Sequence, residues 1–225
     1  GFVKFDVPHT YHEPVSFESE QATTTYYLKK LRQQILYENP DAIAAIVLEP
    51  IPGSNGVIVP PKGYLEGVRA ICDEFGIFMI CDEVMTGFGR TGKMFAVDHY
   101  DFKPDMITFA KGVTSGYAPL GGVIVSKDIA EYFGEELLLT GLTYSGHTMC
   151  TQIGWAALRV VEDEQLVENA ASLGEILKKR LAQIAEHKYV GEVRSIGLFA
   201  AVELTRNKET KEPMLPLSLG YGKDP

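Results

Sequence analysis

Three short apolar segments of the sequence each end in a side chain that can do chemistry. Glu49 follows the first segment, Asp82 and Glu83 follow the second, and Lys111 follows the third. In an open α/β sheet, ligands bind beyond the carboxyl ends of the strands. A single charged residue at a strand end is commonly just solvated. Three successive segments that end in a carboxylate or an amine instead indicate a site.

Lys111 and Asp82 have complementary chemistry. A lysine that ends a buried strand and precedes Gly112 is expected to be partly desolvated, which favours the neutral amine that a Schiff base requires. A carboxylate at Asp82 that faces a pyridine nitrogen would keep that nitrogen protonated and make the ring an electron sink. Together the two residues have the chemistry of a pyridoxal phosphate site.

The segment from Gly87 to Lys93 offers a rival interpretation. It has the glycine spacing and the lysine of a nucleotide-binding phosphate loop. That motif requires Ser or Thr after the lysine to hold magnesium, and this chain has Met94 there. Asp82 and Glu83, just ahead of the segment, would also repel a polyphosphate. A nucleotide site is therefore a distant alternative, which predicts magnesium-dependent ATP binding that is lost in Lys93→Ala.

Other candidate sites are weaker. His9 and His12 lie three residues apart in an irregular, proline-containing segment, which is more typical of a solvated loop than of a metal site. We therefore predict no metal. Ser145 lacks the Gly-x-Ser-x-Gly frame of a hydrolase, and Met85 is interpreted as a packing residue.

The elements that must position these residues alternate between helix and strand. Short continuous apolar strands interleaved with helices predict an α/β fold with a mostly parallel sheet covered by helices on both faces. The expected helices cover residues 19–38, 61–75, 147–162 and 166–184, and the expected strands cover 44–48, 77–80, 106–109, 122–125, 191–195 and 198–204.

Composition excludes several functional classes. The chain has 225 residues, of which 45% are hydrophobic and 23% charged, as in an ordinary globular protein. Its 21 basic and 30 acidic residues give a net charge of −9 without a basic run, so we expect no nucleic acid partner. The apolar runs are too short to span a bilayer, so we expect no membrane partner. The three scattered cysteines are typical of reduced thiols in a cytoplasmic protein.

Four motifs together resemble one family. They are Ile46–Pro50, the block from Cys81 to Gly92, Phe109–Gly112 and Thr143–His147. In this order and spacing they resemble the class III aminotransferases, which are pyridoxal 5'-phosphate enzymes of fold type I. The resemblance runs from about Asp41 to Leu204, and the variants look most similar to the branch that acts on taurine or β-alanine with pyruvate.

The resemblance implies a role for each candidate residue. Lys111 would form the aldimine with the cofactor and then move the proton during transamination. Asp82 would pair with the pyridine nitrogen, and Val84 would pack on one face of the ring. Thr143 would reach the cofactor phosphate of a neighbouring subunit, which implies a homodimer or a higher homo-oligomer. Glu49 would pair with an arginine that recognises the substrate carboxylate.

The chain also departs from the family pattern. Thr148 stands where the family commonly has Pro, and Met85 stands where some branches have Gln, which argues against the ornithine-type branch. The family's phosphate-binding turn and its substrate-recognising arginine are absent from this sequence. We therefore expect a fragment with exposed apolar surface that is poorly soluble or inactive by itself. Residues 1–162 would form the central part of the large domain, 163–189 a connecting helix, and 190–225 the start of a small α/β domain.

The expected function is transamination by a ping-pong mechanism, from an omega-amino acid or amine to pyruvate or another keto acid. Two alternatives remain open at this point. One is an aminomutase or decarboxylase of the same fold, because reaction choice depends on how the substrate is held. The other is an inactive fragment that binds no cofactor.

Overall fold

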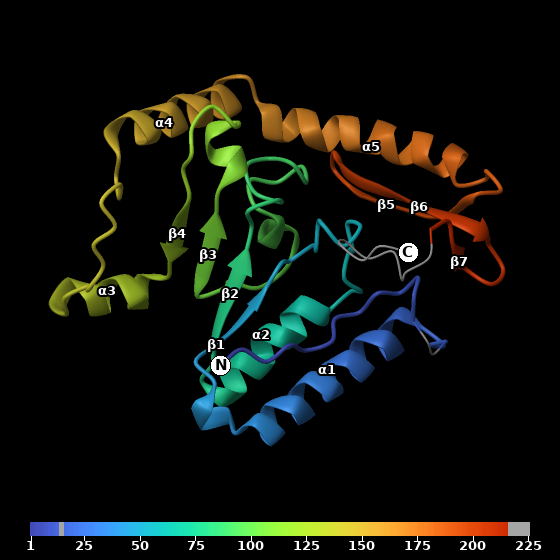
Figure 1. Ribbon diagram of the computed structural model, residues 1–225, viewed down its shortest axis with the longest axis horizontal. Helices are drawn as coiled ribbons and strands as arrows, with labels where there is room; N and C mark the ends of the chain where they lie inside the picture. The colour runs from blue at the N-terminus through green and yellow to red at the C-terminus, as the bar shows by residue number, and fades with distance from the viewer. Residues whose placement is uncertain (14–15, 216–225) are drawn as a thin grey trace.

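The computed structural model describes residues 1–13 and 16–215 and contains two separate sheets (Figure 1). The first sheet has the order β1-β2-β3-β4, in which β1, β2 and β3 are parallel neighbours and β4 is antiparallel to β3. The strands are β1 (Ala45–Leu48), β2 (Phe78–Asp82), β3 (Met106–Phe109) and β4 (Gly122–Val125). The predicted mostly parallel α/β sheet is therefore confirmed.

Two helices pack together against one face of this sheet (Figure 1). The first, α1 (Glu20–Glu38), begins where the Ser19 hydroxyl accepts a hydrogen bond from the Ala22 amide at 3.1 Å, as its capping residue type predicts. The second, α2 (Tyr64–Phe75), ends at Gly76, whose φ of +65° favours glycine. Alternate strand residues and the inner helix faces form the main core, which includes Leu31, Ile35, Ile46, Leu48, Val68, Met79 and Cys81.

The opposite face of the sheet differs from the prediction. We expected helices on both faces, but Val47 and Phe78 are exposed there, as are Val123 and Val125 on β4. The continuous apolar character of these strands is that of a sheet covered on both sides. Within the described residues, that cover is present on one side only. The predicted exposure of apolar surface is confirmed.

Helix α3 (Lys127–Glu135) was not predicted from the sequence. It lies at the edge of the molecule, and the segment 136–147 runs from it to α4 (Thr148–Asp163) (Figure 1). Leu137, Leu139 and Leu142 of that segment are highly exposed. Helix α3 has nine residues, and none of them is buried.

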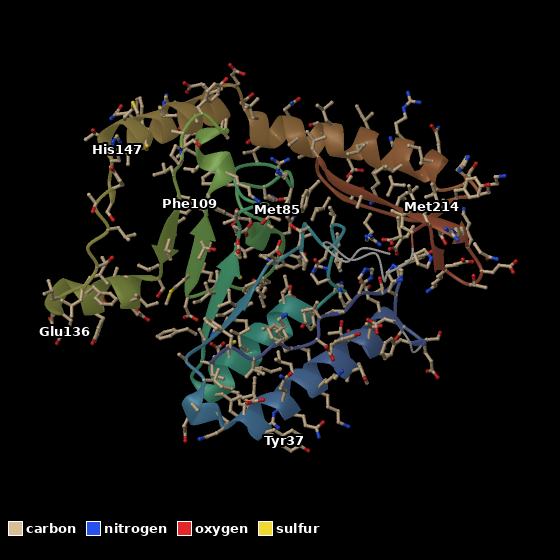
Figure 2. All side chains as sticks on the ribbon, in the orientation of Figure 1. Tyr37, Met85, Phe109, Glu136, His147 and Met214 are labelled. Atoms are coloured by element: carbon tan, nitrogen blue, oxygen red, sulfur yellow. The ribbon has the colours of Figure 1, made fainter. Side chains whose placement is uncertain are left out.

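Helix α5 (Leu166–Ile184) follows α4 and packs on the second sheet (Figure 1). That sheet is antiparallel and consists of β5 (Val190–Ile196), β6 (Phe199–Asn207) and β7 (Glu212–Pro213). A small core of Ile51, Val57, Ala96 and Phe199 joins it to the first sheet. Met85 packs against this core and lies between the two sheets in Figure 2, as its interpretation as a packing residue predicts. No helix in the described part of the chain is long and apolar enough to cross a membrane.

Candidate functional site

The carboxyl ends of β1, β2 and β3 bring the predicted residues to one edge of the first sheet. Because the three strands are parallel neighbours, Glu49, Asp82 and Lys111 all leave the sheet on the same side. Asp82 is in register with Thr108 on β3, three residues before Lys111. The convergence that the sequence predicted is thus present.

Asp82 is half-buried and keeps one carboxylate oxygen available. Its Oδ1 accepts a hydrogen bond from the Val84 amide at 2.9 Å, which fixes the carboxylate over the start of the following loop. Its Oδ2 makes no hydrogen bond to the described residues. Val84 itself is half-buried, so an apolar side chain lies two residues beyond the carboxylate at the same strand end.

Lys111 has an unusual backbone and an exposed side chain. We expected partial desolvation, which is wrong for this chain: β3 ends at Phe109, and the described residues do not enclose Lys111. Its φ is +40°, in the left-handed region that a non-glycine residue rarely adopts. Such strain persists only where the surroundings hold it, and it clusters at functional sites.

Gly112, the residue after Lys111, lets this turn pack closely against Phe88. Gly112 begins the interior of a short 3-10 helix, η3 (Lys111–Thr114), and a Cβ there would lie 3.1 Å from the Phe88 ring. Phe88 in turn contacts Phe109 edge-to-face, with ring centroids 5.7 Å apart. A glycine is therefore required for the close approach of the loop that carries Phe88 to the lysine-bearing turn.

Glu83 does not join Asp82 at the sheet edge. It is 0% exposed, and its carboxylate accepts hydrogen bonds from the Thr86 hydroxyl and from the amides of Ala96 (2.9 Å) and Val97 (2.8 Å). Burial raises its pKa, and the hydrogen bonds from Thr86, Ala96 and Val97 oppose that rise. Glu83 thus ties the two ends of the loop 83–97 together. Nothing in the local sequence separates its role from that of Asp82, because the amides that it binds lie 13 and 14 residues further on.

Glu49 stabilises the turn that follows β1. It is half-buried, and its Oε2 accepts a hydrogen bond from the Gly53 amide at 2.9 Å. The described residues place no arginine against it by a hydrogen bond or an ion pair. The substrate-related role that the resemblance implies for Glu49 stays a prediction.

Thr143 is not brought to the sheet edge with the other candidates. It is exposed on the segment between α3 and α4, near His147, which lies at the far end of α4 in Figure 2. An exposed hydroxyl on a projecting segment is compatible with contact to another subunit and provides none to Lys111 within this chain.

The glycine-rich segment 87–92 has a packing role. The amides of Phe88 and Gly89 both donate to the Met94 carbonyl, at 2.7 and 3.3 Å, so they are not directed at a ligand. A Cβ at Gly92 would lie 3.0 Å from the Ala171 backbone on α5, and Gly197 of the β5–β6 turn approaches the backbone of Thr91. A phosphate loop also leads into an α-helix, whereas a 3-10 helix, η2 (Ala96–His99), follows here. These contacts leave the nucleotide alternative without support.

The residues at the sheet edge fit part of a pyridoxal phosphate site. The exposed amine of Lys111, on its strained turn, would bind the aldehyde carbon of the cofactor. The unengaged oxygen of Asp82 would bind the ring nitrogen, and the apolar side chain of Val84 would cover a ring face. The edge of the first sheet offers no predicted partner for the cofactor phosphate, since Thr143 lies elsewhere.

Comparison with known proteins gives consistent matches. The family model for class-III aminotransferases matches residues 1–222. The solved structure of taurine:2-oxoglutarate aminotransferase from Bifidobacterium kashiwanohense, in complex with pyridoxal phosphate and glutamate, is 53% identical with a TM-score of 0.92 and covers 96% of this chain and 49% of its own. Two curated relatives are the diaminobutyrate–2-oxoglutarate transaminase of Halomonas elongata and the taurine–pyruvate aminotransferase of Bilophila wadsworthia. The first is 40% identical over 89% of this chain and 44% of its own length, and the second is 37% identical over 83% and 42%. The chain therefore spans about half the length of the relatives that it matches.

Proposed function

The chain belongs to the class-III aminotransferases, and from this membership we propose that it serves a pyridoxal-phosphate-dependent transamination. The observation that carries the proposal is the placement of Lys111 and Asp82 at the ends of adjacent parallel strands. This pair supplies an amine and an acceptor of a ring-nitrogen proton at one sheet edge.

The residues of this chain have distinct tasks in the proposed reaction. When bound, pyridoxal phosphate supplies an electron-accepting ring that allows an amino group to be exchanged for a carbonyl oxygen. Lys111 Nζ would hold the group covalently, and its amine would serve as the general base and general acid of the reaction. Asp82 Oδ2 would hold the proton on the ring nitrogen, and Val84 would cover one ring face.

The proposed substrates are an omega-amino acid of the taurine or β-alanine type and a keto acid. Two of the similar proteins are named as taurine aminotransferases, one with 2-oxoglutarate and one with pyruvate as the second substrate. Since the 2-oxoglutarate protein is 53% identical and the pyruvate protein 37%, we place 2-oxoglutarate ahead of pyruvate as the amino acceptor. Glu49 is proposed to act at the substrate side of the site.

The remaining proposals concern assembly, location and domains. Thr143 would bind the cofactor phosphate of a neighbouring subunit, so the active form is proposed to be a homodimer or a higher homo-oligomer. Its exposure and that of the surrounding leucines support this proposal. Three free, buried cysteines support a cytoplasmic location. The division at residues 162 and 189 is retained as a proposed boundary between the large domain, a connecting helix and a small domain.

Absorption spectroscopy with added pyridoxal phosphate tests the cofactor proposal. The wild-type protein should retain a visible-edge absorption band after desalting, and Lys111→Ala should lose it. Lys93→Ala is the matched control, because Lys93 is also an exposed lysine and lies in the loop between β2 and β3. A band that survives in Lys111→Ala and disappears in Lys93→Ala would refute the assignment.

Amino-acceptor preference is tested on the same preparations. Taurine and β-alanine are each supplied with 2-oxoglutarate or pyruvate, and formation of glutamate or alanine is measured. Faster glutamate formation supports the proposed acceptor, whereas alanine alone would reverse the order. Turnover of another amine but of neither of these donors would overturn the substrate class.

A further inference from the structure

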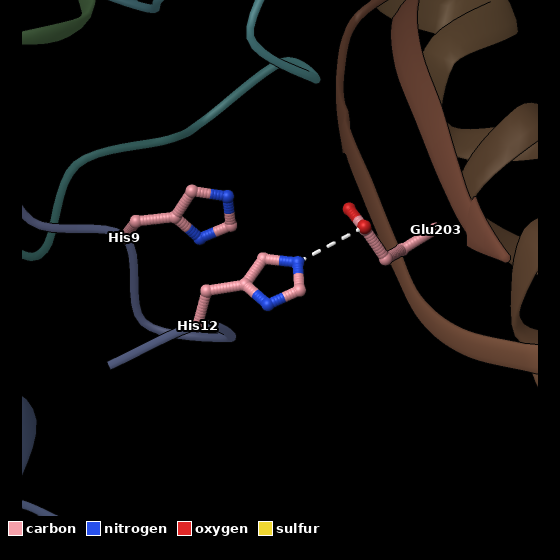
Figure 3. A group of neighbouring side chains, drawn as sticks. All are labelled: His9, His12 and Glu203. Carbon is pink, nitrogen blue, oxygen red and sulfur yellow. Dashed lines mark hydrogen bonds and ion pairs between the residues drawn. The ribbon is translucent and has the colours of Figure 1, made fainter. Parts of the chain in front are cut away.

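Two imidazoles and a carboxylate from opposite ends of the chain meet beside the second sheet. His9 and His12 come from the N-terminal segment, and Glu203 comes from β6 (Figure 3). Their nearest ring nitrogens and carboxylate oxygen all lie within 4.8 Å of one another. His12 Nε2 donates to Glu203 Oε1 at 3.0 Å. None of these residues takes part in the proposed transamination.

The two imidazoles are held on one side of a closed turn. The His12 amide donates to the His9 carbonyl at 3.0 Å, and the His9 amide donates to Glu13 Oε1 at 2.9 Å. Between them, Tyr11 is buried against the second sheet, and Lys211 donates to its carbonyl at 2.7 Å. The turn is therefore anchored to the sheet that carries Glu203, which brings residues 191 positions apart into contact.

Glu203 is held in place by a second, largely buried partner. Arg194 donates to its Oε2 at 2.7 Å and is itself fixed by Glu192 and by the Gly56 carbonyl at 2.8 Å. The arginine therefore occupies one carboxylate oxygen and leaves Oε1 directed at the imidazoles. A carboxylate oriented by an outer partner in this way is typical of metal ligands.

We propose that His9, His12 and Glu203 bind a divalent transition metal ion of the Zn²⁺ type. Two imidazoles and one carboxylate form a donor set that Zn²⁺ uses with a water molecule in the fourth position. His12 is exposed, so water reaches the cluster. His9 and His12 also line a hollow of about 420 Å³ between the N-terminal segment and α1, which provides a path of entry.

The geometry requires only a small adjustment. Tetrahedral ligands about 2.1 Å from Zn²⁺ lie roughly 3.4 Å apart. The 3.0 Å between His12 Nε2 and Glu203 Oε1 is close to that value. All three ligand atoms lie within 4.8 Å of one another, so the widest pair must close by at most about 1.4 Å, an adjustment that side-chain rotation in the cluster would supply. The ion would replace the hydrogen bond between these two residues.

The donor set also decides which ions bind. Ca²⁺ and Mg²⁺ require several oxygen ligands, and here only one carboxylate oxygen remains after Arg194 has taken the other. Imidazole nitrogen favours Zn²⁺, Ni²⁺ and Cu²⁺. Bound metal would connect the N-terminal segment to β6 and so stabilise their contact.

Calorimetric titration of the chelator-treated protein with Zn²⁺ tests this site. Pyridoxal phosphate is kept at saturation in every sample so that its own effect is constant. We expect one Zn²⁺ per chain, a Zn²⁺-dependent rise in melting temperature and no comparable rise with Mg²⁺ or Ca²⁺. His12→Asn and Glu203→Gln should each weaken Zn²⁺ binding by roughly tenfold or more. His187→Asn is the matched control, because His187 is exposed outside the cluster.

Co²⁺ absorption provides a second measurement for variants that are less stable. The wild-type protein should develop visible d–d bands with Co²⁺ that Zn²⁺ displaces, and His9→Asn should not. Absence of Zn²⁺ binding to the wild-type protein would refute the site and leave the cluster as an ion pair between His12 and Glu203. Undiminished Zn²⁺ binding by His12→Asn and Glu203→Gln would refute it as well, since other ligands would then hold the metal.

Discussion

The buried carboxylate of Glu83 gives the sharpest test of how the loop beneath the site is held. It binds the Thr86 hydroxyl and the amides of Ala96 and Val97, and all three partners are donors when the carboxylate is ionised. In Glu83→Gln, the side-chain NH₂ must replace one carboxylate oxygen and would face an amide N–H. One hydrogen bond is lost, and one buried donor is left without an acceptor.

The expected cost follows from these two losses. A lost hydrogen bond contributes about 1 kcal/mol and an unsatisfied buried donor about 2 kcal/mol, so the free energy of unfolding should fall by about 3 kcal/mol at pH values where the carboxylate is ionised. For a chain of this size, that corresponds to a melting temperature lower by about 6–12 °C. Urea denaturation and thermal unfolding both measure the change.

Glu20→Gln is the matched control for this substitution. Glu20 also accepts from a backbone amide, that of Lys62 at 2.9 Å, but it is exposed. Water replaces the lost hydrogen bond there, so the free energy of unfolding should change by less than about 0.5 kcal/mol. Equal effects of the two substitutions would refute the argument from burial.

The pH dependence tests the electrostatic part of the same argument. Burial raises the pKa of Glu83 above its value of about 4.3 in the unfolded chain. The carboxyl group therefore stabilises the folded state fully below about pH 4.3, and this contribution is lost as the pH rises through the folded pKa. Glu83→Gln lacks this titration, so the stability difference between wild type and variant should shrink from acidic to neutral pH. A difference that grows with pH would show that the hydrogen bonds to the ionised form outweigh burial.

Three further predictions concern packing, thiol reactivity and helix capping. Gly197→Ala should lower the free energy of unfolding, measured by urea titration, by at least about 2 kcal/mol, because the φ of Gly197 is +55° and the new Cβ would meet the Thr91 backbone. Gly134→Ala is the control: Gly134 lies on α3 with open space around it, so this substitution should be neutral or stabilising. Burial raises the pKa of the Cys72 thiol to about 11 and that of the Cys81 thiol to about 12. Neither thiol should therefore react with a disulfide reagent at pH 8 until urea unfolds the chain. Rapid labelling of both in the native protein would contradict their burial. Ser19→Ala should cost about 1 kcal/mol through loss of the α1 cap, and an unchanged urea midpoint would indicate that water replaces the hydroxyl.

Local patterns in the sequence were sufficient for the elements and for the edge at which the chemistry lies. Apolar runs marked the four strands of the first sheet to within one or two residues, and Ser19 and Gly76 marked the limits of two helices. These features depend on backbone geometry and on neighbours close in sequence. Because parallel strands end at a common edge, the placement of Glu49, Asp82 and Lys111 followed from the order of the strands.

Only the tertiary structure separated the neighbours Asp82 and Glu83. The two have nearly the same local context, but Asp82 remains at the edge while Glu83 turns inward to amides 13 and 14 residues away. The exposure of Lys111 and its positive φ likewise depend on tertiary contacts: Phe88 packs closely on Gly112, and no described residue encloses the lysine side chain. The pair His9 and His12 is visible in the sequence, but nothing there joins it to Glu203, which lies 191 residues beyond His12. Contacts between distant segments carry no periodicity, so a sequence pattern determines which elements form, and only their packing decides which side chains meet.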